Sequence, residues 1–150
     1  MVVVLIISVL SSITVPSVQR IQRRAKTTTI VNDFRTFAAA FDTYAQENGA
    51  WPAEAAAGVM PTGMSTLLST SAWQRRTPMG GQYDWDNNQM HFGVRYQAGV
   101  AISGTASAPL VLDVPQLTDL EKVIDGPTFN WVGGSFHIGT GLVPLYIIQP

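Results

Sequence analysis

The sequence predicts an α+β protein in which one long N-terminal helix packs on a small antiparallel β-sheet head. The first 48 residues contain no glycine, whereas the rest of the chain holds all 13. Strict alternation of apolar and polar residues, which is typical of a strand with one buried face, runs from Met90 to Ile102. These two patterns divide the chain into a glycine-free helix of residues 1–48 and an α+β head of residues 49–150.

Residues 1–15 (MVVVLIISVLSSITV) are the apolar start of this helix. At 1.5 Å per residue they reach about 22 Å, against about 30 Å for a hydrocarbon core, so we expect about five or six further apolar residues before Met1. We interpret this segment as a membrane or filament-core helix; a cleaved signal peptide and a buried helix of a soluble protein are the alternatives. The apolar side chains expected in the membrane or filament core are Val2, Val3, Val4, Leu5, Ile6, Ile7, Val9, Leu10, Ile13 and Val15.

Residues 16–48 form the amphipathic part of the helix, called the stem below. Pro16 removes the hydrogen bond to the Ser12 carbonyl and predicts a kink there. Apolar residues at spacings of three and four form a stripe that widens over residues 31–48, so we expect this part to pack against the head. Asn48-Gly49 predicts the helix end. The predicted packing residues are Ile30, Val31, Phe34, Phe37, Ala38, Phe41, Tyr44 and Ala45.

Charge separates the stem from the head. Residues 17–36 carry five cations against Asp33, a net charge of +4, and residues 37–150 carry nine acids against four bases, a net charge of −5. This division indicates attraction between the stem of one copy and the head of another. The alternatives are a solvated helix face and binding to lipid headgroups. We predict no specific nucleic-acid partner, because the whole chain is nearly neutral.

The head is expected to combine short helices with a sheet. The Asn87-Asn88 pair predicts a hairpin turn that leads into the alternating strand. With no cysteine in the chain, the head has no disulfide. The predicted elements are a helix over 64–73, strands over 82–86 and 90–102, a short strand or lead-in over 110–114, a helical turn or two over 117–124, and a closing hairpin of 135–138 and 142–148.

The head contains acids, histidines and tryptophans that are candidates for a metal, catalytic or binding site. Residues 84–88 match the first three ligand positions of an EF-hand loop, but Gln89 and Arg95 replace the required glycine and glutamate. We predict no cofactor and no catalytic site; calcium at Asp84, Asp86, Asp119 or Asp125 is the alternative to solvated turn carboxylates. His91 and His137 are interpreted as surface or rim residues. The tryptophans are interpreted as core and loop anchors, with a sugar-stacking surface as the alternative: Trp51, Trp73, Trp85 and Trp131.

Three stretches resemble the superfamily of type IV pilins and type II secretion pseudopilins. They are VVVLIISVLSSITVPSVQRIQRRAK, FDTYAQENGAWP and TPMGGQYDWD. The first is similar to the pilin helix, the second to its end, and the third to the entry into the pseudopilin sheet. The family signature starts with a leader, a Gly-Phe cleavage site and a glutamate, which we expect upstream of Met1.

The resemblance implies a structural subunit, not an enzyme. Such subunits are located in the bacterial inner membrane before assembly, with the head in the periplasm, and they then assemble into a pilus or pseudopilus filament. The implied partners are copies of the chain, related pilins, the assembly platform and the prepilin peptidase. The alternatives are a minor or tip pilin that binds a surface, DNA or a secreted substrate, and a secreted soluble β-domain with a cleaved signal peptide.

Overall fold

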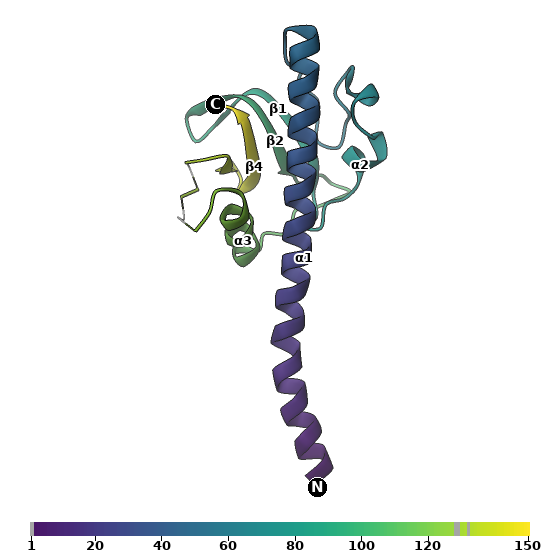
Figure 1. Cartoon of the computed structure of the whole chain (residues 1–150), viewed down its shortest axis with the longest axis vertical. Helices are drawn as coiled ribbons and strands as arrows, with labels where there is room; N and C mark the ends of the chain where they lie inside the picture. The colour runs from purple at the N-terminus through teal and green to yellow at the C-terminus, as the bar shows by residue number, and fades with distance from the viewer. Residues whose placement is uncertain (1, 128–129, 132) are drawn as a thin grey trace.

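The structure, a computed structural model, describes residues 2–127, 130–131 and 133–150, with the side chains of the first helix described from Ser17 onward. A long helix, α1 (Val2–Asn48), stands beside a four-stranded antiparallel sheet, and the N-terminal half of the helix extends beyond the head (Figure 1). The α+β class predicted from the sequence is therefore confirmed. The C-terminal part of α1 therefore packs within the head, and its N-terminal part projects beyond it.

Local sequence explains the helical state of α1 and its end. The hydroxyls of Thr27, Thr28 and Thr29 each donate a hydrogen bond of 3.0 Å to the carbonyl four residues earlier, so the polar groups of this β-branched run have partners within the helix. At the end, the Asn48 side chain donates to the Tyr44 carbonyl. Gly49 then takes a positive φ of 71°, a conformation that glycine adopts without steric cost.

The sheet consists of β1 (Gln82–His91), β2 (Val94–Ser103), β3 (Phe136–Gly139) and β4 (Val143–Gln149). Its strand order is β1-β2-β4-β3, with every neighbouring pair antiparallel. Thus β2 and β4 are central, while the short β3 lies at one edge. The closing hairpin of β3 and β4 forms where the sequence predicted it.

The first hairpin differs from the prediction. The sequence predicted a turn at Asn87-Asn88, but β1 continues to His91 and the chain reverses at Phe92-Gly93. Phe92 and Gly93 have φ angles of 49° and 82°, as a two-residue hairpin turn with positive φ at both positions requires. Met90, Phe92 and Val94 are consequently exposed instead of lying on a buried strand face.

Short helices fill the connections. The helix predicted over residues 64–73 is divided into a 3-10 turn, η1 (Met64–Thr66), and α2 (Thr70–Gln74). A third helix, α3 (Val114–Ile124), is longer than the helical turn expected over 117–124 and packs against α1. Leu110 does not start a strand; it makes an isolated bridge with Gly80. Pro115 in the first turn of α3 is a standard helix-start residue, because its missing N–H has no helical partner there.

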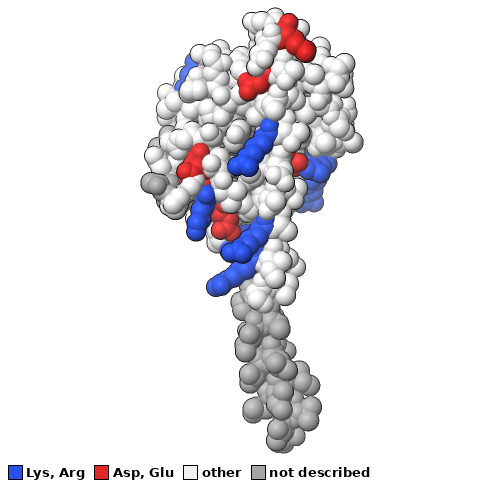
Figure 2. Space-filling view, in the orientation of Figure 1, with Lys and Arg blue, Asp and Glu red and all other residues white. Residues whose placement is uncertain are grey.

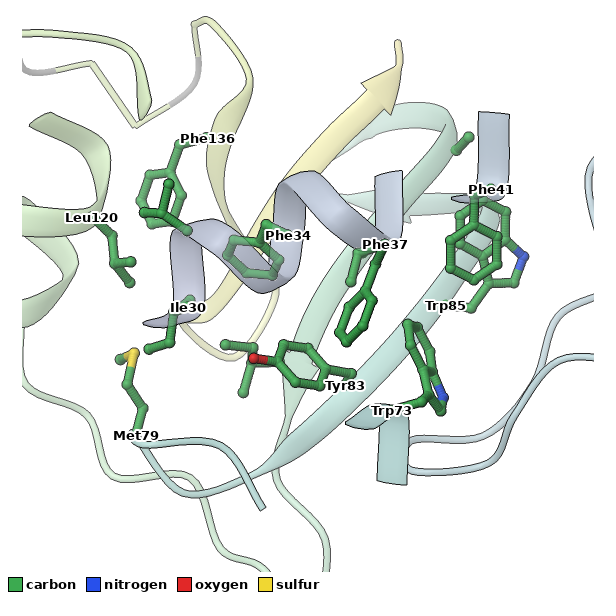
Figure 3. Close-up of a cluster of buried hydrophobic side chains, with 14 of the residues drawn as sticks. Ile30, Phe34, Phe37, Phe41, Trp73, Met79, Tyr83, Trp85, Leu120 and Phe136 are labelled. Atoms are coloured by element: carbon green, nitrogen blue, oxygen red, sulfur yellow. The ribbon is translucent and has the colours of Figure 1, made fainter. Parts of the chain in front are cut away.

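The core lies between α1 and the inner face of the sheet (Figure 3). Aromatic side chains of the stem face Tyr83 and Trp85 of β1, and Trp73 of α2 closes one side. A smaller apolar cluster covers the opposite face of the sheet. Its buried members are Tyr96, Ala101, Leu145 and Ile147.

Candidate functional site

The stem residues that the sequence predicted to face the head lie between α1 and the sheet. Phe41 stacks on Trp85 with a distance of 3.8 Å between ring centroids, and Phe34 stacks on Tyr146 at 5.6 Å. Phe37 meets Tyr83 edge to face at 4.7 Å. The buried members of the predicted set are Ile30, Val31, Phe34, Phe37, Ala38 and Phe41, and the half-buried members are Tyr44 and Ala45.

Polar bonds fix the stem at two further points. Asp33 accepts hydrogen bonds from the Tyr83 hydroxyl and the Arg75 guanidinium. Burial raises the pKa of the Tyr83 hydroxyl above its usual range, and the bond to Asp33 raises this pKa further. Nearer the N-terminus, the buried Gln116 of α3 donates to the Thr27 hydroxyl over 2.5 Å. These bonds fix both the rotation and the height of α1 against the head.

The stem base, residues 17–26, is where α1 enters the head. Its Lys26 lines a cavity of about 230 Å³ with Arg76 and Val111. Lys26 also lines a second cavity of about 290 Å³ with Arg23 and Gln116. The two cavities share Lys26, Asp113 and Gln116, so they form one groove between the stem base and the start of α3. Figure 2 shows Lys and Arg side chains gathered at this junction.

The groove carries more positive than negative charge. Arg23, Lys26 and Arg76 line it, and Asp113 is the acidic group in its lining. Arg23 and Asp113 form a partly exposed ion pair with an N–O distance of 3.9 Å. An exposed pair of this kind contributes little to stability, about 0–1 kcal/mol. The groove is therefore suited to contact an anionic partner more than to hold the fold together.

Four ionisable side chains meet on the sheet face opposite α1. Single carboxylate oxygens of Glu54, Asp84 and Asp86 lie within 4.8 Å of one another. The pKa of Asp86 is raised to about 6, mainly by burial and also by the Asp84 carboxylate, while the hydrogen bond to His91 opposes this rise. Burial also raises the pKa values of Asp84 and Glu54. The sequence singled out Asp84 and Asp86 as possible ion ligands. Glu54 comes from another part of the chain and His91 from the end of β1, and both lie beside them only in the folded protein.

Both histidines form specific hydrogen bonds. The Nδ1 atom of His91 accepts from the Thr140 backbone N–H, so Nε2 carries the proton and donates to Asp86 over 2.9 Å. His137 bonds to the Tyr96 hydroxyl through Nδ1 and to the Gly134 carbonyl through Nε2. His137 is buried, not at the rim as the sequence suggested, and its bonds connect the edge strand to β2.

The other acids considered for calcium occupy different surroundings. Asp125 accepts hydrogen bonds from the backbone N–H groups of Ser135 and Phe136, at 2.8 and 2.7 Å. Asp119 is half-buried on α3, away from this pair of bonds. Asp125 therefore joins the end of α3 to the start of the β3 hairpin.

Sequence reasoning missed one feature at the tips of the two hairpins. Phe92 and Leu142 adopt positive φ angles of 49° and 62°, although their side chains are bulky and exposed. The Phe92 N–H donates to the Thr140 hydroxyl over 3.4 Å, so the tips contact each other. The Phe92-Gly93 pair is the local signal that could have predicted this turn, because glycine is common in such turns.

The predicted membrane or filament-core side chains from Val2 to Val15 lie outside the described side chains, and so does Pro16, the predicted kink. The backbone of α1 is helical from Val2 onward. Within the part of the chain that the structure describes, no helix has an apolar stretch long enough to cross a membrane.

The fold is similar to that of a solved pilin. The structure of the major type IV pilin PilA1 from Clostridium difficile superposes with a TM-score of 0.55 and 17% sequence identity, over 87% of this chain and 98% of that chain. No family model matches the sequence, and no curated protein matches it. The chain therefore has the fold of a type IV pilin, with the long helix and the antiparallel sheet as the shared parts.

Proposed function

We propose that the chain is a structural subunit of a filament of the type IV pilus or type II secretion pseudopilus kind. One observation supports this most strongly: α1 is continuous, with its C-terminal half inside the head core and its N-terminal half projecting beyond the head (Figure 1). A projecting helix with an apolar sequence needs other copies or a lipid phase to cover it. The pilin fold of the whole chain supports the same role.

In this proposal the N-terminal half of α1 is in the inner membrane before assembly and in the filament core afterwards. The head is then periplasmic until assembly. Packing of the apolar residues 2–15 against other copies would drive assembly, and a kink at Pro16 would adjust the helix to its neighbours. The prepilin peptidase and an assembly platform are the expected partners, together with related pilins. The role is non-enzymatic.

The test is a charge placed in the apolar segment. We expect Ile6→Asp to prevent incorporation into filaments, because an acidic side chain at the centre of a membrane helix costs about 2.5–3.5 kcal/mol. Ala39→Asp is the matched control: it adds the same charge on the same helix, at an exposed position beside the head. Filaments sheared from cells are examined by electron microscopy, and tryptophan fluorescence verifies that each head is folded.

Normal incorporation of the Ile6→Asp chain would contradict the proposal. So would normal polymerisation of a chain that lacks the apolar residues 2–15. The amount of the chain in sheared filaments also separates two roles within the proposal. A main subunit accounts for most of the filament mass, whereas a minor or tip subunit, which could bind an external surface, is present in only a few copies.

A further inference from the structure

The underside of the head beside the stem base exposes large apolar side chains. Val111 and Leu112 lie in the loop before α3, and Val114 is the first residue of this helix; 59%, 47% and 57% of their surfaces are exposed. Val18 and Ile21 of the stem base are also exposed. Single exposed apolar residues are ordinary, but consecutive ones beside a cationic groove form a defined surface.

Cations surround these apolar residues. Val111 shares a cavity lining with Lys26 and Arg76, and the neighbouring Asp113 pairs with Arg23. Arg20 is exposed on the stem base one turn of α1 before Arg23. We call this combination the basal surface; it comprises Arg20, Arg23, Lys26, Arg76, Val111, Leu112 and Val114.

We propose that the basal surface docks the head onto anionic phospholipid headgroups. The inference rests on the proposed function in one respect, that the N-terminal half of α1 is in a membrane before assembly. The cations attract headgroup phosphates, and the apolar loop enters the boundary between headgroups and acyl chains. Basic residues combined with exposed apolar residues are the composition of surfaces that bind at an anionic membrane interface.

The charges favour lipid over a second copy of the chain as the partner. A second copy would have to bring acidic residues and apolar residues together on one surface. Of the exposed acids, Asp42 and Glu47 lie near the far end of α1, where the neighbouring residues Thr43, Gln46 and Asn48 are polar. The third, Glu54, accepts a hydrogen bond from the Asn87 backbone N–H. Lipid supplies the negative charge and the apolar layer in one partner.

Docking requires the stem to tilt. Eight residues of helix separate Val15 from Arg23, about 12 Å, whereas the headgroup layer of one leaflet is about 5–8 Å thick. A stem tilted toward the side of α3 lowers the loop at Val111 and the groove together, and arginine and lysine side chains extend toward the phosphates. The basal surface therefore selects one direction of tilt and fixes the height of the head above the membrane.

The absence of cysteine from the sequence permits a direct test with the full chain. Leu112→Cys is labelled with an environment-sensitive fluorophore, and the protein is reconstituted into vesicles of phosphatidylcholine alone or of phosphatidylcholine with phosphatidylglycerol. We expect a blue shift of the label's emission only with phosphatidylglycerol, and its reversal at high salt. A label at Gln46→Cys, about 30 Å along α1 from Lys26, should show no shift.

Two charge variants then test the placement of the cations. Lys26→Gln with Arg76→Gln removes two cations of the basal surface, both of which line the groove together with Val111. We expect the ratio of docked to undocked heads to fall about fivefold for each cation, hence about 25-fold. Arg35→Gln with Arg95→Gln is the matched control, because it changes the net charge equally at exposed positions away from this surface. The control should dock like the wild type.

Three results would overturn the proposal. The first is an equal emission shift of the label at residue 112 in both vesicle types. The second is an equal loss of docking in the two double variants. The third is an emission shift that depends on the protein-to-lipid ratio and not on lipid charge. The last result would identify a second copy as the partner. Filament formation is scored separately in the Ile6→Asp experiment, so failure of docking and failure of the proposed function are distinguishable.

Discussion

Replacing Phe41 by alanine tests whether the stem is an integral part of the head core. Phe41 is fully buried, stacks on Trp85 at 3.8 Å and meets Trp73 at 5.5 Å. Truncation of a buried phenylalanine to alanine costs about 3–5 kcal/mol, and each lost aromatic pair contributes about 0.5–1.5 kcal/mol of such a cost. Because small domains are stable by about 5–15 kcal/mol, we expect the variant to lose at least about a fifth of its free energy of unfolding.

The assay is urea unfolding of the full chain in detergent solution, followed by tryptophan fluorescence. This signal is appropriate because the residue at position 41 contacts two tryptophans. Thr43→Ala is the matched control on the same helix: the Thr43 side chain is exposed and its hydroxyl bonds only to the Ala39 carbonyl among the bonds described. We expect the control to change the free energy of unfolding by less than about 0.5 kcal/mol.

A loss below about 1 kcal/mol in Phe41→Ala would refute this reasoning. It would mean that the head folds without the stem and that the helix only rests on its surface. A loss confined to the midpoint, with an unchanged slope against urea concentration, is the expected form of the result, because the native fold stays intact.

The other predictions concern single interactions of the head. Asp86 has a higher pKa in the folded chain than its ordinary value of 3.8, so the folded chain binds more protons and its free energy of unfolding should decrease as pH rises from about 4 to about 6, by at most about 3 kcal/mol. Asp86→Asn should make this decrease smaller and leave the part that the raised pKa values of Asp84 and Glu54 contribute, which unfolding curves measured across that interval would show; an unchanged decrease would exclude Asp86 as a source. Tyr83→Phe removes a hydrogen bond to the Asp33 carboxylate and should cost about 1.5–3 kcal/mol in urea unfolding, whereas a neutral result would mean that Arg75 alone satisfies this carboxylate. Leu142→Asn should raise the free energy of unfolding by about 0.5–1 kcal/mol, because asparagine tolerates the φ of 62° better than leucine does; a lower thermal midpoint would contradict this.

The long helix and the pilin-like class could be predicted because their signals are local and repeated. Three signals along the stem predict the same helix. They are the absence of glycine, the apolar spacings of three and four, and the Asn48-Gly49 pair at the end. The closing hairpin was predictable for the same reason, since Gly139 and Gly141 bracket its turn. Such signals add up over many residues, so a single exception does not change the prediction.

The first hairpin was mispredicted because the apolar alternation continues through its turn. Phe92 and Val94 continue the pattern of the strand, yet both are exposed at the hairpin tip. Alternation reports the period of a strand and not which face is covered, so it cannot distinguish a buried residue from an exposed one. Gly93 is the signal that favours a turn at this point, because glycine adopts the positive φ that such a turn requires.

The acidic cluster could be anticipated only in part. Asp84 and Asp86 share a strand face because side chains alternate along a strand. Glu54 joins them from the segment after α1, where its carboxylate accepts a hydrogen bond of 2.6 Å from the Asn87 backbone N–H. His91 joins them from the end of β1 by bonding to Asp86. Contacts of this kind depend on tertiary placement, which no spacing in the sequence encodes.

The continuity of α1 has a mechanical consequence. The helix runs for 47 residues, about 70 Å, and its aromatic row of Phe34, Phe37 and Phe41 lies along the helix axis against the sheet. A pulling force on the N-terminal half travels along this axis and loads the row in shear, so the contacts must slide together. They cannot be peeled away one at a time. The contacts between α1 and the head therefore resist separation most strongly when the force acts along the helix axis.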